Sequence, residues 1–124
     1  MKITLEEVKP YYEQGTHGLN HIKRVTHNAL LIAETENCDK EVVKAAALLH
    51  DIARDVDETK DQGLCHAKEG AKRAKKILQD YDYTSEQKKN ITHCIRVHRY
   101  STQLKPQTIE AAILQDADRL DALG

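Results

Sequence analysis

Hydrophobic residues recur every three or four positions along almost the whole chain, which is the period of an α-helix with one buried face. In one stretch, for example, Ile22, Val25 and Ala29 fall on the same face. No stretch shows the sustained apolar-polar alternation of a half-buried strand. The pattern predicts helices over residues 4–14, 19–36, 39–53, 66–79, 85–98 and 108–123. We therefore expect an all-α fold, built as a single bundle of about six helices.

Residues with capping preferences support these boundaries. Thr4 and Glu7 have the spacing of a capping box, in which each side chain accepts a hydrogen bond from the other residue's backbone. Asp39 is a typical N-cap for the third helix. Pro106 stands just before the last helix, where a proline is tolerated.

The third helix is apolar nearly all round, because residues 45–49 read Ala-Ala-Ala-Leu-Leu. Such a helix is expected to be buried in the centre of the bundle. It runs directly into His50 and Asp51. Adjacent helical residues point about 100° apart. Both side chains can therefore flank one point beyond the end of a core helix.

Other helices also carry polar residues on their apolar faces. Asp116 falls on the stripe of the last helix and is predicted to occupy a core position. That stripe comprises Ile109, Ala112, Ile113, Asp116, Ala117 and Leu120. His98 follows Ile91 and Ile95 on the fifth helix, and His21 precedes Val25 on the second. A buried carboxylate without a partner costs several kcal/mol, so it must be paired or bound to a metal.

Taken singly, a histidine on an apolar face is more often a satisfied core residue than a ligand. Here several helices send His or Asp inward, and His66 at the start of the fourth helix adds another. Helical bundles build metal sites in this way. The pattern therefore favours one shared metal centre over separate salt bridges, since each buried carboxylate would otherwise need a cation of its own.

Composition narrows the range of functions. The 124 residues suffice for one domain, with 40% hydrophobic and 31% charged residues and a net charge of −1. The absence of Phe and Trp favours close packing of helices through Leu, Ile, Val and Ala. The charge balance gives no strong sign of nucleic-acid binding, and no apolar stretch approaches membrane-spanning length. Three cysteines without a CxxC pair and no signal-like start indicate a cytoplasmic protein with free thiols. Its oligomeric state stays open.

These residues form a recognisable order. His21, then His50-Asp51, then Asp116 resembles the H…HD…D signature of the HD domain superfamily. Residues 21–25 (HIKRV) and 47–52 (ALLHDI) resemble the family's first-histidine helix and central motif. Residues 116–124 (DADRLDALG) resemble the closing motif of a bacterial branch of uncharacterised HD hydrolases. Members of that branch typically continue past this motif, so residues 1–124 are expected to be one HD domain, with a missing C-terminal extension as an open alternative.

The resemblance implies an HD-type helical bundle that binds a divalent metal through His21, His50, Asp51 and Asp116. The ligand types suit Mn, Fe, Co, Ni, Zn or Mg. Some branches bind a second metal, for which His66 and His98 match the additional histidines and Asp51 the bridging carboxylate. Those branches often have two adjacent histidines where only His98 stands here. We therefore expect one metal ion, with a second as an alternative.

The family's activity is hydrolysis of phosphate mono- or diesters, commonly nucleotides, so a small phosphorylated substrate is the expected partner. Candidates to bind its phosphate are Arg54, Lys23, Arg99 and Arg119. Asp121 lies five residues after Asp116, on a different face, and is expected to be solvated or to accept a hydrogen bond from a ligand. The fourth helix carries Lys68, Lys72, Arg73, Lys75 and Lys76. These cations can steer anions, but a solvated face is the favoured interpretation.

Two other functions are compatible with the same residues. Some proteins on the HD scaffold are di-iron oxygenases, which requires His66 and His98 as ligands of a second iron. A non-catalytic domain that binds a metal or a nucleotide is the other alternative. A complete inward set of ligands favours the hydrolase.

Overall fold

The computed structural model describes residues 1–12, 16–54, 66–99 and 104–123, and its helices agree with the predicted all-α class. Its elements are α1 (Leu5–Val8), η1 (Lys9–Tyr12), α2 (Thr16–Glu34), α3 (Lys40–Leu49), α4 (His66–Ile77), η2 (Leu78–Asp80), α5 (Ser85–Arg96) and α6 (Ile109–Leu123), where η marks a 3-10 helix. The described residues contain six α-helices and no strand. The prediction of an all-α bundle of about six helices is confirmed.

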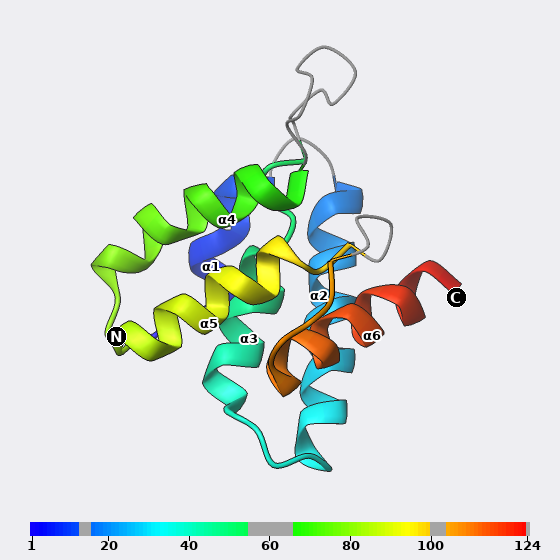
Figure 1. The fold of residues 1–124 in the computed structure, drawn as a ribbon. Coiled ribbons are helices and arrows are strands. Elements are labelled where there is room, and N and C mark those ends of the chain that lie inside the picture. The colour runs from blue at the N-terminus through cyan, green and yellow to red at the C-terminus, as the bar shows by residue number, and fades with distance from the viewer. Residues whose placement is uncertain (13–15, 55–65, 100–103, 124) are drawn as a thin grey trace.

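Helix α3 is the central helix of the bundle. It packs against α2, α5 and α6, with α2 and α6 on one side and α4 and α5 on the other (Figure 1). From Val42 to Leu49 every residue except Lys44 is buried. The three consecutive alanines let neighbouring helices approach closely, which compensates for a core without Phe or Trp. The predicted burial of this helix nearly all round is confirmed.

Two predicted helices end at least four residues earlier than their patterns suggest. The capping box of Thr4 and Glu7 is present, but α1 ends at Val8 and gives way to a 3-10 helix that contains Pro10. Proline lacks the N–H that an α-helix needs in its interior. The third helix was predicted to reach residue 53, whereas α3 ends at Leu49 and residues 51–54 form turns. His50 therefore stands at the end of the helix rather than within it.

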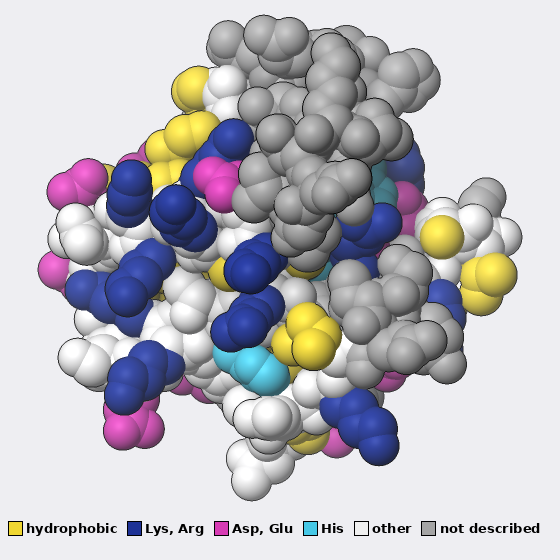
Figure 2. Space-filling view, turned by 45° about the horizontal axis from the view of Figure 1, so that its top comes forward, with side chains coloured by type: hydrophobic (Ala, Val, Ile, Leu, Met, Phe, Trp, Pro, Cys, Tyr) yellow, Lys and Arg dark blue, Asp and Glu magenta, His cyan; other side chains and the backbone are white. Residues whose placement is uncertain are grey.

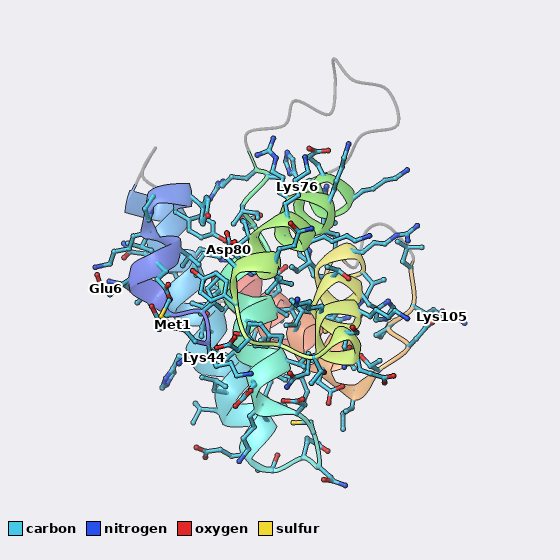
Figure 3. The ribbon with its side chains drawn as sticks, turned by 90° about the vertical axis from the view of Figure 1, so that its left-hand side faces the viewer. Met1, Glu6, Lys44, Lys76, Asp80 and Lys105 are labelled. Atoms are coloured by element: carbon cyan, nitrogen blue, oxygen red, sulfur yellow. The ribbon has the colours of Figure 1, made fainter. Side chains whose placement is uncertain are left out.

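The first residues pack against the connection between α4 and α5. The backbone N–H of Asp82 donates to the carbonyl of Met1, at 3.1 Å. The N–H of Ile3 donates to the hydroxyl of Tyr83, at 3.0 Å. Figure 3 shows Met1 on the same side of the bundle as Asp80. These contacts tie the start of the chain to a segment some eighty residues later.

Two expectations from composition concern thiols and membranes. Cys38 and Cys94 are free thiols, as predicted, and Cys65 lies outside the described residues. Among the helices that the structure describes, none is both long enough and apolar enough to span a membrane.

Helix α6 presents a different face to the core from the one that its hydrophobic pattern predicts. Ile109 and Leu120 are 40% and 52% exposed, and Asp116 is exposed with them. The buried positions include Glu110 and Gln115 instead. The prediction that Asp116 occupies a core position is therefore wrong.

Hydrogen bonds explain this rotation of α6. The two carboxylate oxygens of Glu110 accept from the backbone N–H of Asp39 at 2.8 Å and from the side-chain amide of Asn90 at 2.9 Å. The amide of Gln115 donates to the carbonyl of Val97 at 2.6 Å. Buried polar groups with such partners cost little. The helix therefore turns two polar residues inward and leaves two apolar ones outside.

Candidate metal centre

His50 ends α3 with its side chain fully buried. Its Nδ1 lies 2.7 Å from the carbonyl oxygen of Ala47, which can only accept a hydrogen bond. Nδ1 therefore carries a proton, and in the neutral ring Nε2 has a free lone pair. A carbonyl partner of this kind fixes the tautomer that many metal-binding histidines use.

His21 is oriented by a carboxylate rather than by the backbone. Its Nδ1 lies 2.7 Å from Oδ2 of Asp121 on α6, so of the two roles expected for Asp121 the structure shows the hydrogen-bond acceptor. Arg24 on α2 holds the same carboxylate, with Nε 2.6 Å from Oδ1 and Nη2 3.2 Å from Oδ2. These hydrogen bonds, that of Arg24 above all, lower the pKa of Asp121 and keep it ionised. Nε2 of His21 is thereby directed away from Asp121.

The free nitrogens of both histidines meet a second carboxylate from α6. Asp118 Oδ1 lies 3.1 Å from Nε2 of His21 and 3.5 Å from Nε2 of His50. The two Nε2 atoms lie 3.4 Å apart. Asp118 and Asp121 are separated by three residues and share a face of the helix. One face of α6 thus supplies both the carboxylate between the histidines and the one behind His21.

Three electron pairs converge at this point. With both Nδ1 atoms protonated, the two Nε2 atoms and the Asp118 oxygen are all acceptors, so they require a shared proton or a cation between them. Protonation of His21 is accordingly favoured. The hydrogen bond with Asp118 is the main cause that raises the pKa of His21. Burial would raise the pKa of Asp118, but hydrogen bonds with His21 and His50 hold it well below its usual value. The centre is built to take a positive charge.

The spacing of these atoms fits a metal ion. Ligand atoms about 2.1 Å from a common ion lie about 3.0 to 3.4 Å apart at angles between about 90° and 109°. The three separations found here are 3.1, 3.4 and 3.5 Å. The side chains of His21 and Asp118 are about a quarter exposed, whereas that of His50 is not exposed at all. Two imidazoles and one carboxylate therefore form a candidate divalent-metal site that opens to solvent on one side.

His98, a predicted ligand for a second metal, lies directly behind His50. Their ring centroids are 4.9 Å apart in an edge-to-face arrangement. Nδ1 of His98 donates to the carbonyl of Ile95 at 2.6 Å. Burial, and then the proximity of His50, lower the pKa of His98 to about 4. The ring is therefore neutral at physiological pH, and its Nε2 retains a lone pair.

The other predicted ligands lie outside the three-atom group. Asp51 is half-buried, and its charge contributes to the raised pKa of His21, which places it near the centre. Its Oδ2 lies 3.7 Å from Nη1 of Arg54. His66 is half-buried at the first position of α4. A ligand role for Asp51, and a second metal held by His66 and His98, stay predictions.

The predicted phosphate-binding cations occupy different elements. Lys23, Arg54 and Arg119 are exposed, and Arg99 is half-buried directly after His98. Arg54 packs over Gly18, since a Cβ placed on that glycine would lie 3.3 Å from Nη1. The guanidinium of Arg54 therefore lies beside both Gly18 and Asp51.

Sequence reasoning missed two residues of this centre. Asp118, rather than Asp116, reaches the histidines, and Arg24 anchors the carboxylate behind His21. A signal was available for the first. If Asp121 accepts a hydrogen bond from a ligand, the carboxylate three residues before it shares its face. Nothing in the pattern distinguished Arg24 from its charged neighbours.

Comparison with known proteins shows which family the chain resembles. A sequence model of the HD domain matches residues 18–123. A solved structure described as a predicted HD superfamily hydrolase, from an uncultured Thermotogales bacterium, superposes with a TM-score of 0.75 and is 37% identical, covering 95% of this chain and 64% of that one. Two curated relatives are each 33% identical: a tRNA (cytidine(56)-2'-O)-methyltransferase of Thermoplasma volcanium, over 90% of this chain, and Ribonuclease Y of Thermoanaerobacter pseudethanolicus, over 87%. The chain spans only 33% and 19% of their lengths.

Proposed function

Because the chain belongs to the HD domain family, we propose that it is a divalent-metal-dependent phosphohydrolase that cleaves a phosphate mono- or diester. The observation that carries the proposal is the convergence of His21, His50 and Asp118 on one point, with spacings that suit a metal ion. A divalent ion supplies Lewis-acid chemistry there: it lowers the pKa of water and polarises a phosphoryl oxygen.

The protein's own residues have separate tasks in this scheme. His50, fixed by the carbonyl of Ala47, and His21, fixed by Asp121, keep their Nε2 lone pairs directed at one point. Asp51 lies beside the centre without joining the three-atom group, which leaves its carboxylate available to orient the attacking water and accept its proton. Arg54 is assigned to the substrate phosphate, because its guanidinium lies next to Asp51 and is exposed.

The class of substrate is the less defined part of the proposal. Nucleotides are the common substrates that the family resemblance implied, and one relative's name designates a ribonuclease. We therefore propose a nucleotide or another nucleic-acid phosphate ester as the substrate of this domain. The di-iron oxygenase stays the alternative, because it requires a second iron held by His66 and His98, whereas the described residues group His21, His50 and Asp118 around one point.

The test is phosphate or nucleotide release after metal removal and the return of Mn, Co, Ni, Mg, Fe or Zn one at a time. The panel includes nucleoside mono-, di- and triphosphates, a chromogenic phosphodiester and a short RNA. Asp118→Asn removes the carboxylate between the histidines. Asp116→Asn makes the same change two residues earlier on the exposed side of the helix and serves as the matched control.

Turnover that depends on metal, is lost in Asp118→Asn and persists in Asp116→Asn is the expected result. The reverse order of the two variants would refute the assignment of Asp118. Absence of turnover in the folded, metal-loaded protein would refute hydrolysis by this domain alone, and oxygen consumption by the iron-loaded protein would support the oxygenase.

A further inference from the structure

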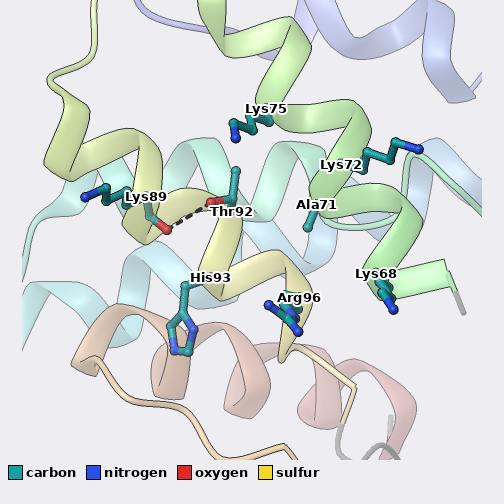
Figure 4. A pocket seen from close by; sticks show the side chains of 8 residues that line it. All are labelled: Lys68, Ala71, Lys72, Lys75, Lys89, Thr92, His93 and Arg96. Carbon is teal, nitrogen blue, oxygen red and sulfur yellow. Dashed lines mark hydrogen bonds between the residues drawn. The ribbon is translucent and has the colours of Figure 1, made fainter.

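A groove of about 400 Å³ runs between α4 and α5. It is lined by Lys68, Ala71, Lys72, Lys75, Lys89, Thr92, His93 and Arg96 (Figure 4). Figure 2 shows Lys and Arg side chains gathered on this face of the molecule around a histidine. We call this feature the basic groove. It shares no lining residue with the metal centre.

The order of its residues follows from helical spacing. On α4 the lysines stand at intervals of four and three residues, and on α5 the spacing from Lys89 to Arg96 is seven. Figure 4 places Lys75 and Lys89 towards one end and Lys68 and Arg96 towards the other. Seven residues of helix rise about 10 Å. The two walls thus carry rows of cations along a common channel about 10 Å long.

The sequence favoured a solvated face for the cations of the fourth helix, and the structure divides them into two sets. Arg73 turns towards Glu69, with Nε 3.4 Å from Oε1, and towards the carbonyl of Ile52. Lys72 and Lys75 instead line the basic groove, and neither forms an ion pair within the described parts of the chain. Among the described residues, no carboxylate pairs with the charge of either lysine.

The walls hold no competing acid among the described residues that line the groove. Its base is formed by two small side chains, that of Ala71 and that of Thr92, whose hydroxyl donates to the carbonyl of Lys89 at 3.0 Å. The backbone N–H of Gln107 donates to Nε2 of His93 at 3.0 Å. Because that nitrogen accepts, the neutral ring carries its proton on Nδ1 and offers one more donor.

We propose that the basic groove binds a single strand of nucleic acid by its phosphodiester backbone. Rows of Lys and Arg along a channel are the usual means of holding a chain of phosphates. A strand that rises about 3.4 Å per nucleotide places about three phosphates in a channel of this length. The described lining of the groove contains no Phe, Tyr or Trp on which bases stack, so recognition rests on the cations and is independent of base sequence.

Other polyanions fit the groove less well. A membrane surface is flat, and peripheral binding to it relies on apolar side chains that insert beside the cations. The described lining of the groove contains no large apolar side chain. Packed helices have axes about 8–10 Å apart, which leaves too narrow a channel for a duplex to enter. A single strand matches both the concave shape and the length.

Position links the groove to the centre described above. Helix α5 ends at Arg96, and two residues later His98 packs against His50. The end of the groove formed by Lys68 and Arg96 is therefore the end nearer to the metal centre. Binding in the groove nevertheless does not require hydrolysis, so the two proposals can fail separately.

The test measures fluorescence anisotropy of a labelled single-stranded RNA of twelve nucleotides, in EDTA so that no turnover occurs. The groove variant is Lys72→Glu/Lys75→Glu. Both positions are exposed, so the variant should still fold, which is checked by circular dichroism. The control Lys40→Glu/Lys44→Glu makes the same change of charge on α3. Figure 3 shows Lys44 well apart from Lys76 on α4.

With about three phosphates neutralised, the slope of log K against log salt is expected near −2, a loss of about twentyfold between 50 and 200 mM. The groove variant should bind at least about tenfold more weakly at 50 mM salt, with a slope nearer −1, while the control stays within about twofold. Equal losses in both variants, or no binding by the wild type, would overturn the proposal. So would tighter binding of duplex RNA of the same length, or of phosphatidylserine vesicles in place of RNA.

Discussion

The carboxylate of Asp121 offers the sharpest test of how the metal centre is held. It lies 2.7 Å from Nδ1 of His21. Asp121 would therefore affect a bound metal ion only indirectly, through the imidazole ring of His21. Asp121→Asn keeps an oxygen that can accept the same hydrogen bond but removes the negative charge. Asp121→Ala removes both. The pair of variants therefore separates the effect of charge on the basicity of His21 from the effect of the hydrogen bond on its orientation.

The expected magnitude follows from the role of such carboxylates in other metal sites. Loss of a partner that orients a metal-binding histidine costs about 10- to 100-fold in metal affinity, or about 1.4 to 2.7 kcal/mol. We expect Asp121→Asn at the lower end of this range, because its amide oxygen still fixes the tautomer. Asp121→Ala should reach the upper end, because Nε2 of His21 is then free to turn away from Asp118.

Isothermal titration calorimetry with Mn²⁺ at pH 7.5 measures these affinities, and thermal unfolding in EDTA tests whether each variant still folds. Asp116→Asn is the control, since this residue is exposed on the same helix. Affinities of both Asp121 variants within about twofold of the wild type would refute the proposed positioning of His21. An equal loss in Asp116→Asn would show that helix charge, rather than the contact with His21, is responsible.

Two further predictions concern stability. The folded-state pKa of His98, about 4, lies below the value of 6.5 expected when the chain is unfolded, so the folded protein binds fewer protons between these values and loses stability as pH falls through this window. By pH 4.5 the loss is about 2 to 3 kcal/mol. Urea unfolding in EDTA should show a pH dependence smaller by about this amount in His98→Phe, and an unchanged dependence would contradict the reasoning. Glu110→Ala leaves the N–H of Asp39 and the amide of Asn90 without their partner, and should lower the free energy of unfolding by about 2 to 4 kcal/mol. A loss below about 0.5 kcal/mol in urea unfolding would show that these hydrogen bonds do not fix α6.

The features that sequence predicts best are those with a strong apolar signal. The run of alanines and leucines before His50 predicts that α3 is central and that His50 ends a core helix, and both are observed. His21 was placed on the core side of its helix by Val25 and Ala29, which are both fully buried. For these two histidines, the hydrophobic period and the family motif point to the same residues.

Helix α6 carries a weaker signal. Ile113 and Ala117 are buried both in the predicted face and in the observed one, so they do not distinguish between two rotations of the helix. The choice rested on Ile109 and Leu120, which are exposed, against Glu110 and Gln115, which are buried. The apolar pattern alone predicts that the first two are buried and the last two exposed, which is the reverse of what is found. The reason is that the free energy of burying a polar side chain depends on hydrogen-bond partners elsewhere in the chain. Those partners, Asp39, Asn90 and Val97, become neighbours only in the folded protein.

The same polar contacts explain how the centre is assembled. Its ligand atoms come from α2, the end of α3 and α6, and in the absence of a cation or a shared proton they are acceptors facing one another. That arrangement gives no net attraction by itself, so other contacts must hold α6 in place. Glu110 fixes the start of the helix against α3 and α5, and Arg24 fixes its far end against α2 through Asp121. With both ends held by contacts that involve no ion, Asp118 lies between His21 and His50. A metal that binds there would not have to order the helix.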